Sequence, residues 1–189
     1  MPHPFVVGLG GSLNPTSTSQ SALVAALNAA RDAGATTELL ALRDLRLPFY
    51  QPDWSLDAYP PNVVRLIEAV RRADVLLLST PGYHGTLAGV TKNALDFLEF
   101  LADDAPPYLN NKFVGLIATA SGELAAVNAL NSLGYVAQSL RGLLIPLQVP
   151  IPRADKAIDE AGHITDQRVA RRLQGLGALA VELARRFQR

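Results

Sequence analysis

Apolar segments of strand length alternate with amphipathic segments of helix length along this chain of 189 residues. We expect strands at 5–10, 37–42, 75–80, 113–119 and 143–149, and helices at 21–33, 61–73, 90–102, 125–140 and 165–187. Such alternation predicts one α/β domain over residues 1–189, with a parallel sheet covered by helices on both faces. Right-handed crossovers between five strands favour the doubly wound order 2-1-3-4-5.

Three polar segments interrupt the pattern, at 10–19, 81–86 and 119–123. They follow the first, third and fourth expected strands directly. In a doubly wound sheet the carboxyl ends of parallel strands share one edge, and ligands bind beyond that edge. We therefore expect the three segments to line a single site.

Composition excludes several classes of function. Basic and acidic residues number 17 each, so the chain lacks the positive field of a nucleic-acid-binding protein. No apolar stretch reaches the roughly 18 residues that span a membrane, and no signal peptide precedes the first strand, so we expect a cytoplasmic protein. The chain has no cysteine, and its three histidines are scattered without metal-ligand spacing. Redox chemistry would therefore require an organic cofactor.

The first polar segment, "GLGGSLNPTSTSQS", matches neither common nucleotide-binding motif. The dinucleotide fingerprint fails because Leu13 stands where a third small residue is needed, and the Walker A motif fails because no Lys-Ser or Lys-Thr follows. What remains is free backbone N–H groups and hydroxyls ahead of a helix N-terminus, which suit a phosphate dianion. The alternative is a solvated loop in which Ser19 caps the helix.

The second and third segments add features that suit a planar ligand. "PGYHGTLAGVTKNALDF" joins a proline, two glycines and an aromatic side chain, so that backbone N–H groups can reach the edge of a heteroaromatic ring beside Tyr83. The alternatives are that Tyr83 only packs and that His84 is a surface histidine. The small residues of "TASGE" allow close approach of the backbone to a flat ligand.

In this order and spacing, "GGSLNPTSTSQSAL", "STPGYHGTLAGVTKNALDFLE" and "ATASGE" resemble the NAD(P)H-dependent FMN reductases, which have the flavodoxin-like fold. The resemblance runs from about residue 5 to 149. It implies that FMN places its phosphate in the first loop and its ring between the second and third. The implied FMN-binding residues are Ser12, Asn14, Ser17, Thr18, Ser19, Pro81, Gly82, Tyr83, His84, Gly85, Thr119, Ala120, Ser121 and Gly122.

The chain departs from the family pattern at two of these positions. Many members have an arginine where this chain has Asn14, and a Gly-Gly pair where it has Ser121 and Gly122.

The resemblance implies a hydride relay from NADPH or NADH through FMN to a second acceptor, either free flavin or a small electrophile. No catalytic side chain and no metal are required, because the flavin carries the chemistry. A quinone or azo-dye reductase would use the same site. A flavodoxin-like electron carrier is disfavoured by the zero net charge, since such carriers dock through acidic surfaces. The remaining alternative is a phosphate-binding regulatory domain without flavin.

Two further segments suggest partners. In the expected helix 90–102, acidic residues form one stripe and apolar residues cover the rest, which predicts burial against both the sheet and a second subunit in a homodimer or homotetramer. The connection 43–62 carries Tyr50 and Trp54 and is longer than an ordinary linker. It either borders the site entrance and selects the acceptor, or is a purely structural lid.

Overall fold

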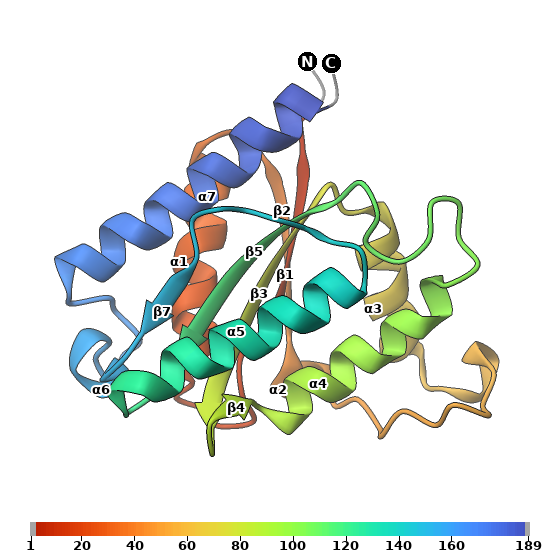
Figure 1. The fold of residues 1–189 in the computed structure, drawn as a ribbon, viewed down its shortest axis with the longest axis horizontal. Helices are drawn as coiled ribbons and strands as arrows, with labels where there is room; N and C mark the ends of the chain where they lie inside the picture. Colours follow the sequence, from red (N-terminus) through yellow and green to blue (C-terminus); the bar gives the residue numbers. More distant parts are fainter. Residues whose placement is uncertain (1–2, 188–189) are drawn as a thin grey trace.

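A parallel sheet forms the centre of the computed structural model, which describes residues 3–187, and helices cover both of its faces (Figure 1). The main strands follow the order β2-β1-β3-β5-β6, which confirms the predicted order. The strands are β1 (Phe5–Gly10), β2 (Thr36–Ala41), β3 (Val75–Tyr83), β4 (Thr86–Leu87), β5 (Phe113–Thr119), β6 (Leu143–Leu144) and β7 (Val149–Ile151). Of these seven strands only β4 is antiparallel, and it pairs with the end of β3.

Long helices flank the sheet in two layers. The helices are α1 (Thr18–Asp32), α2 (Leu42–Leu45), α3 (Pro61–Arg72), α4 (Gly89–Asp96), α5 (Glu123–Ser139), α6 (Ala154–Ala157) and α7 (Gln167–Phe187), with 3-10 turns at η1 (Leu56–Ala58) and η2 (Phe97–Leu101). Helices α1 and α7 lie on one face, and α3, α4 and α5 lie on the other (Figure 1). Among residues 3–187, no helix is both long enough and apolar enough to cross a membrane.

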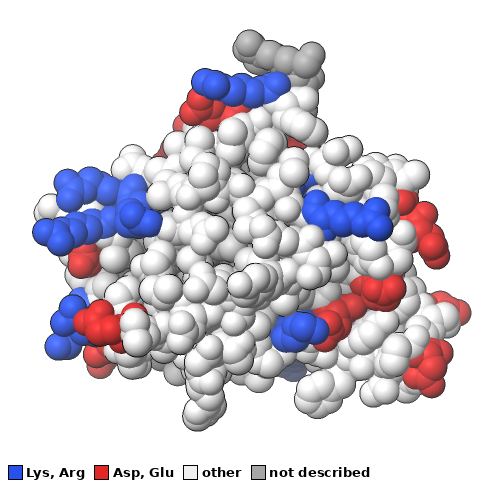
Figure 2. Space-filling model, viewed as in Figure 1, with Lys and Arg blue, Asp and Glu red and all other residues white. Residues whose placement is uncertain are grey.

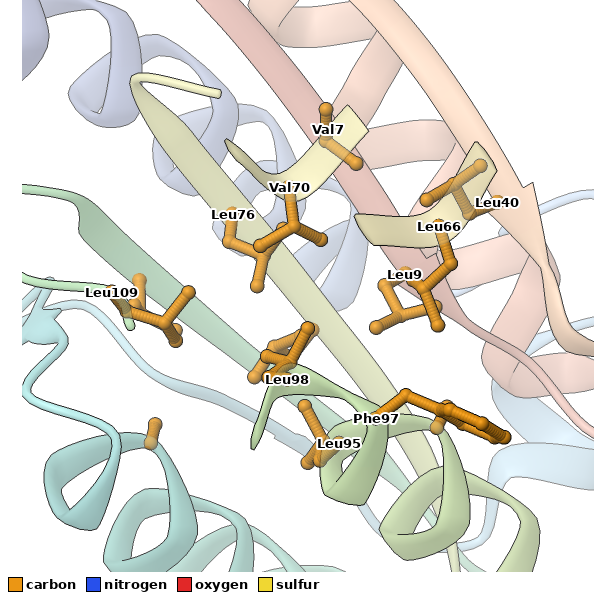
Figure 3. Packing of buried hydrophobic residues seen from close by; sticks show 14 of the residues in the cluster. Val7, Leu9, Leu40, Leu66, Val70, Leu76, Leu95, Phe97, Leu98 and Leu109 are labelled. Atoms are coloured by element: carbon orange, nitrogen blue, oxygen red, sulfur yellow. The ribbon is translucent and has the colours of Figure 1, made fainter. Parts of the chain in front are cut away.

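The core consists of two clusters, one on each face of the sheet. Strand β3 contributes to both, because Val75 and Leu77 point towards α1 and α7 while Leu76 and Leu78 point towards α3 and α4. This two-sided burial explains the uninterrupted apolar run of β3. Figure 3 shows the cluster on the face covered by α3 and α4, in which side chains of the sheet contact those of α3, α4 and η2.

The fifth strand was predicted to be continuous, but the structure divides it. It divides into β6 and β7, which both pair with β5 in parallel but leave residues 145–148 outside the strands. Pro146 lies in this interruption and has no N–H to donate to the ladder, which explains the break. The expected helix 90–102 also divides, into α4 and the tighter turn η2.

The chain itself covers the apolar arc that we expected to face a second subunit. Leu95, Phe97 and Leu98 are fully buried within the described structure. The rings of Tyr50 and Tyr59 pack edge-on against Phe97, with centroid separations of 5.5 and 5.0 Å. The connection between β2 and α3 therefore occupies the second side of this helix. This arc gives no support to an oligomer.

Two glycines inside helices provide a matched test of packing. A Cβ atom at Gly177 would lie 2.3 Å from the Ala26 carbonyl oxygen, where α7 crosses α1, whereas a Cβ at Gly134 would meet only side chains at 3.5 Å or more. We expect Gly177→Ala to lower the free energy of unfolding by about 1–3 kcal/mol through overpacking. Gly134→Ala should raise it by about 0.5–1 kcal/mol through helix propensity. Urea unfolding followed by circular dichroism measures both, and equal effects would contradict this packing.

Candidate functional site

The strand register brings the three polar loops to one edge of the sheet. Pro81 on β3 pairs with Thr119 on β5, so the second and third loops begin side by side. Gly10 on β1 pairs with Ser79 on β3, and the Gly11 N–H donates to the Ser79 carbonyl at 3.3 Å. The predicted convergence of the loops is therefore present in the backbone.

The first loop ends in a helix cap that differs from the expected one. Helix α1 begins at Thr18 rather than at residue 21, and its N-cap is Ser17, not Ser19. The Ser17 hydroxyl accepts from the Gln20 N–H at 3.2 Å and contacts the Ser19 hydroxyl at 3.0 Å, and both side chains are buried. The backbone N–H groups of Thr18 and Ser19 have no acceptor within the helix, and the positive end of the helix dipole lies at this loop.

Asn14 folds the loop back on itself. Its side-chain oxygen accepts from the Thr16 N–H at 3.0 Å and from the Thr16 hydroxyl at 3.1 Å. The Asn14 N–H donates in turn to the Ser12 hydroxyl at 3.2 Å. The Asn14 oxygen thus shapes the turn, and only its side-chain NH₂ group is left to contact a ligand.

A direct side-chain contact joins the first and third loops. The Thr18 hydroxyl donates to the Thr119 hydroxyl at 3.2 Å, across 101 positions of sequence. The third loop is also held from its other side, because the Ala120 N–H donates to the Ile151 carbonyl at 3.1 Å and the Ala120 carbonyl accepts from the Ala154 N–H at 3.0 Å. Ser121 and Gly122, which follow, are exposed and lead directly into α5.

The second loop is a tight hairpin. Tyr83 pairs with Thr86, and His84 and Gly85 between them both have positive φ angles, of 50° and 86°. This pattern is that of the two-residue turns that connect twisted strands, and it favours glycine at the second position. Tyr83 is 51% exposed, so its ring is available to a ligand. His84 lies at the exposed tip of the turn.

A buried threonine holds the base of this hairpin. The Thr80 hydroxyl accepts from the Ala88 N–H at 3.0 Å and lies 3.0 Å from the Thr91 hydroxyl. It also donates to the Pro81 carbonyl at 3.1 Å. This network fixes the start of α4 against the end of β3, so the hairpin projects from a rigid support.

Two cavities border the first loop, and the sequence motifs predicted neither. One, of about 510 Å³, lies between residues 15–21 and the carboxylates of Asp155, Asp159 and Glu160. Hydrogen bonds from His163 keep the pKa of Asp159 below its usual value, so this carboxyl stays ionised. The acidic side chains of 155–160 are the sequence signal for this cavity, which repels anions.

The second cavity, of about 380 Å³, lies between Leu13 of the first loop and the segment that follows β2. Among residues 3–187, no group of three or more acidic, histidine or cysteine side chains is placed to hold a metal ion.

A sequence model of the NADPH-dependent FMN reductase family matches residues 4–156. The chain belongs to this family. The match confirms the resemblance that the three loop sequences indicated. It is consistent with the predicted oxidoreductase activity that uses FMN and NAD(P)H. The FMN-dependent NADPH-azoreductase of Staphylococcus aureus is 37% identical over 108 residues, which are 57% of this chain and 54% of that protein. The chain thus spans about half the length of the curated relatives it matches.

Solved structures of flavoproteins share the fold. FerB, a flavoenzyme NAD(P)H:(acceptor) oxidoreductase from Paracoccus denitrificans, superposes with a TM-score of 0.78 at 24% identity, over 97% of this chain and 98% of that one. An NADH:FMN oxidoreductase in its apo form gives a TM-score of 0.70 at 19% identity, over 96% and 88% of the two chains. A flavodoxin from the domain Archaea gives 0.59 at 10% identity over 96% and 99%. The predicted flavodoxin-like fold of this FMN reductase family member is confirmed.

Gly85 in the hairpin turn and Gly89 at the start of α4 provide a test of the site. A Cβ atom would meet no neighbour at either Gly85 or Gly89, but only Gly85 has a positive φ. We expect Gly85→Val to distort the turn at a cost of about 1–2 kcal/mol and to weaken FMN binding about 10-fold. Gly89→Val should leave binding unchanged.

Quenching of FMN fluorescence on titration with protein measures both variants. Equal dissociation constants for the parent and Gly85→Val would show that the hairpin does not contact the ring.

Proposed function

We propose that this chain is an NAD(P)H-dependent FMN reductase, which transfers hydride from NAD(P)H by way of bound FMN to a second acceptor. The main support for the proposal is that three loops meet at one edge of the sheet. The pairing of Pro81 with Thr119 joins the second and third loops, and the hydrogen bond between Thr18 and Thr119 joins the first and third. When bound, FMN supplies the position that accepts and returns the hydride. Family membership and the curated azoreductase relatives support this assignment.

The first loop would hold the phosphate without a basic side chain. The free N–H groups of Thr18 and Ser19 and the dipole of the 15-residue helix α1 provide the positive potential. Ser12 and Thr18 add hydroxyl groups, and Ser17 and Ser19 support them by capping the helix. We assign FMN phosphate binding to this set together with the Asn14 side-chain NH₂ group.

The second and third loops would hold the ring system. We assign Pro81, Gly82, Tyr83, His84 and Gly85 to one edge and face of the ring, because the hairpin presents a rigid backbone and an exposed tyrosine there. We assign Thr119, Ala120, Ser121 and Gly122 to the pyrimidine side of the ring.

Helix α5 gives the third loop an electrostatic role. It begins at Glu123, directly after Gly122, so the positive end of a 17-residue helix faces the proposed pyrimidine edge. Arg153 pairs with Glu123 at 2.9 Å and offsets the negative charge of that carboxylate. The helix dipole and the loop N–H groups would stabilise negative charge that develops on the reduced ring. No side chain is needed as a general acid or base.

The nature of the second acceptor separates the closest alternatives. The curated relatives are named as azoreductases, which favours an azo compound or another small electrophile over free flavin. A one-electron carrier is disfavoured by the formal net charge of zero. A stable blue semiquinone on partial reduction would favour the carrier instead.

We also propose a cytoplasmic homodimer or homotetramer without a nucleic-acid partner. The neutral net charge supports the absence of a nucleic-acid partner. Support for self-association comes from α5, where Leu124, Val127 and Tyr135 are exposed, and Figure 2 shows a face with few charges where α5 crosses the molecule. Sedimentation as a monomer at micromolar concentration would contradict it.

Oxidation of NADPH by flavin-stripped protein under air, with and without added FMN, tests the proposed activity. We expect the near-ultraviolet absorbance that distinguishes reduced from oxidised nicotinamide to fall steadily only when protein and FMN are both present. FMN without protein is the control, and NADH in place of NADPH tests the donor. Absence of turnover with either donor, together with unquenched FMN fluorescence, would contradict the proposal.

A further inference from the structure

The cavity of about 380 Å³ beside the first loop lies outside the set of residues assigned to FMN. Its volume falls within the range of about 300–1,000 Å³ that is typical of small-molecule sites. The wall combines apolar side chains with two arginines and one asparagine, which suits a ligand that has both an aromatic and an anionic part. The lining residues are Leu13, Leu42, Arg43, Arg46, Leu47, Phe49, Val90 and Asn93.

Phe49 is held in an exposed position on this wall by contacts on both sides. Asn93 on α4 donates from Nδ2 to the Pro48 carbonyl at 2.8 Å, and its Oδ1 accepts from the Tyr50 N–H at 3.0 Å. Phe49, between these two anchored neighbours, is 83% exposed, and Leu13 on the first loop is 58% exposed. Two apolar side chains that stay in water beside one cavity provide a preformed surface for a flat ring.

Arg46 has a backbone conformation that arginine rarely adopts. It is the C-cap of α2 and lies in the left-handed region, with φ at 45° and ψ at 48°. Glycine is the usual residue at such a helix end, and strain of this kind is concentrated at functional sites. Asn62 on α3 holds the residue by donating to its carbonyl at 3.3 Å. Among residues 3–187 the Arg46 guanidinium forms no ion pair, so its charge is available to a ligand.

Arg43 adds a second guanidinium group to the same wall. It pairs with the neighbouring Asp44 at 3.3 Å, and the two side chains are 43% and 66% exposed. An ion pair so open to solvent is weak, so a phosphate dianion can compete with the carboxylate for Arg43. Two guanidinium groups on one wall suit a phosphate ester, because the planar fork of arginine binds phosphate oxygens in pairs.

The cavity is close to the ring hairpin but separate from it. No residue of 81–85 or 119–122, the segments assigned to the ring, lines it. Val90 on its wall lies four residues after Thr86 of β4, which limits the distance between their Cα atoms to about 14 Å. A ligand that contacts both the ring and this cavity must therefore be long. A nicotinamide dinucleotide has this form, because two riboses and a pyrophosphate join its nicotinamide to its adenine.

We propose that this cavity binds the adenosine end of NADPH, and that Arg46 and Arg43 select NADPH over NADH by binding its 2′-phosphate. Arginine fulfils this role in the dinucleotide-binding sites of Rossmann folds. The adenine would lie on Phe49 and Leu13, and the nicotinamide would extend from the cavity to the flavin beside Tyr83. This inference rests on the proposed function and adds the residues that choose its hydride donor.

Donor kinetics of the FMN-loaded protein test the proposal. We expect the parent to use NADPH with a kcat/KM at least about 10-fold above that for NADH. Arg46→Gln should lower kcat/KM about 10-fold for NADPH and leave that for NADH unchanged, because only NADPH loses a charge-assisted hydrogen bond. Phe49→Ala should lower kcat/KM for both donors, since both carry adenine. Arg171→Gln, exposed on α7, is the matched control and should change neither.

Calorimetric titration with 2′,5′-ADP and with 5′-AMP gives a readout that does not depend on turnover. We expect the parent to bind 2′,5′-ADP about 10-fold more tightly than 5′-AMP, and Arg46→Gln to remove the difference. If neither donor is oxidised but 2′,5′-ADP binds through Arg46, the proposed reductase activity fails and the 2′-phosphate site stands. If Arg46→Gln lowers kcat/KM equally for both donors, or changes neither the donor kinetics nor the affinity for 2′,5′-ADP, the assignment of Arg46 to the 2′-phosphate is wrong.

Discussion

The parallel ladder formed by β1, β3 and β5 decides where the polar loops of this protein lie. Because β3 is buried on both faces, its register against β1 and β5 is fixed by side chains that pack in two opposite directions. That register places Pro81 beside Thr119 and Gly10 beside Ser79. A slip of one residue would exchange the two faces of the strand and separate the loop ends. The geometry of the candidate site is thus a consequence of the core.

Hydroxyl groups at this sheet edge turn the ladder into a rigid site. Thr80 binds the start of α4, Thr18 binds Thr119, and the Ser79 hydroxyl donates to the Ser19 carbonyl at 2.8 Å. Each bond joins segments that are distant in sequence or belong to different layers. Ser and Thr are short enough to bridge two backbones without opening the packing. A preorganised loop set of this kind loses little entropy when it binds a ligand.

Much of this arrangement follows from the sequence, because it depends on local pattern. Alternating strand and helix periodicity predicts the layers and strand order, and glycine- and hydroxyl-rich segments after the first, third and fourth strands predict the edge where they meet. The sequence could not show that Ser17 rather than Ser19 caps α1, because the two residues have the same chemistry. They are distinguished only by the hydrogen bond from the Ser79 hydroxyl on β3 to the Ser19 carbonyl. The break in the fifth strand had a visible signal in Pro146.

Tertiary contacts determine the features that the sequence did not reveal. The apolar residues of α4 and η2 were expected to need a second subunit, but Tyr50 and Tyr59 cover Phe97 from a connection about 40 positions earlier. The same connection was expected either to border the site entrance with Tyr50 and Trp54 or to serve as a structural lid. Asn93 fixes the segment so that Tyr50 turns inward and Phe49 outward. The positions of these two side chains depend on the amide group of Asn93, and no periodic pattern in the sequence indicates them.

We propose that the three loops form one site for FMN, with the phosphate at the N-terminus of α1. Equilibrium binding of FMN and of riboflavin, which has the same ring but no phosphate, tests it most directly. We expect one FMN per chain, bound at least about 100-fold more tightly than riboflavin, because the phosphate gains several charge-assisted hydrogen bonds. Equal affinity for the two flavins, or binding of neither, would show that the three loops do not form this FMN site.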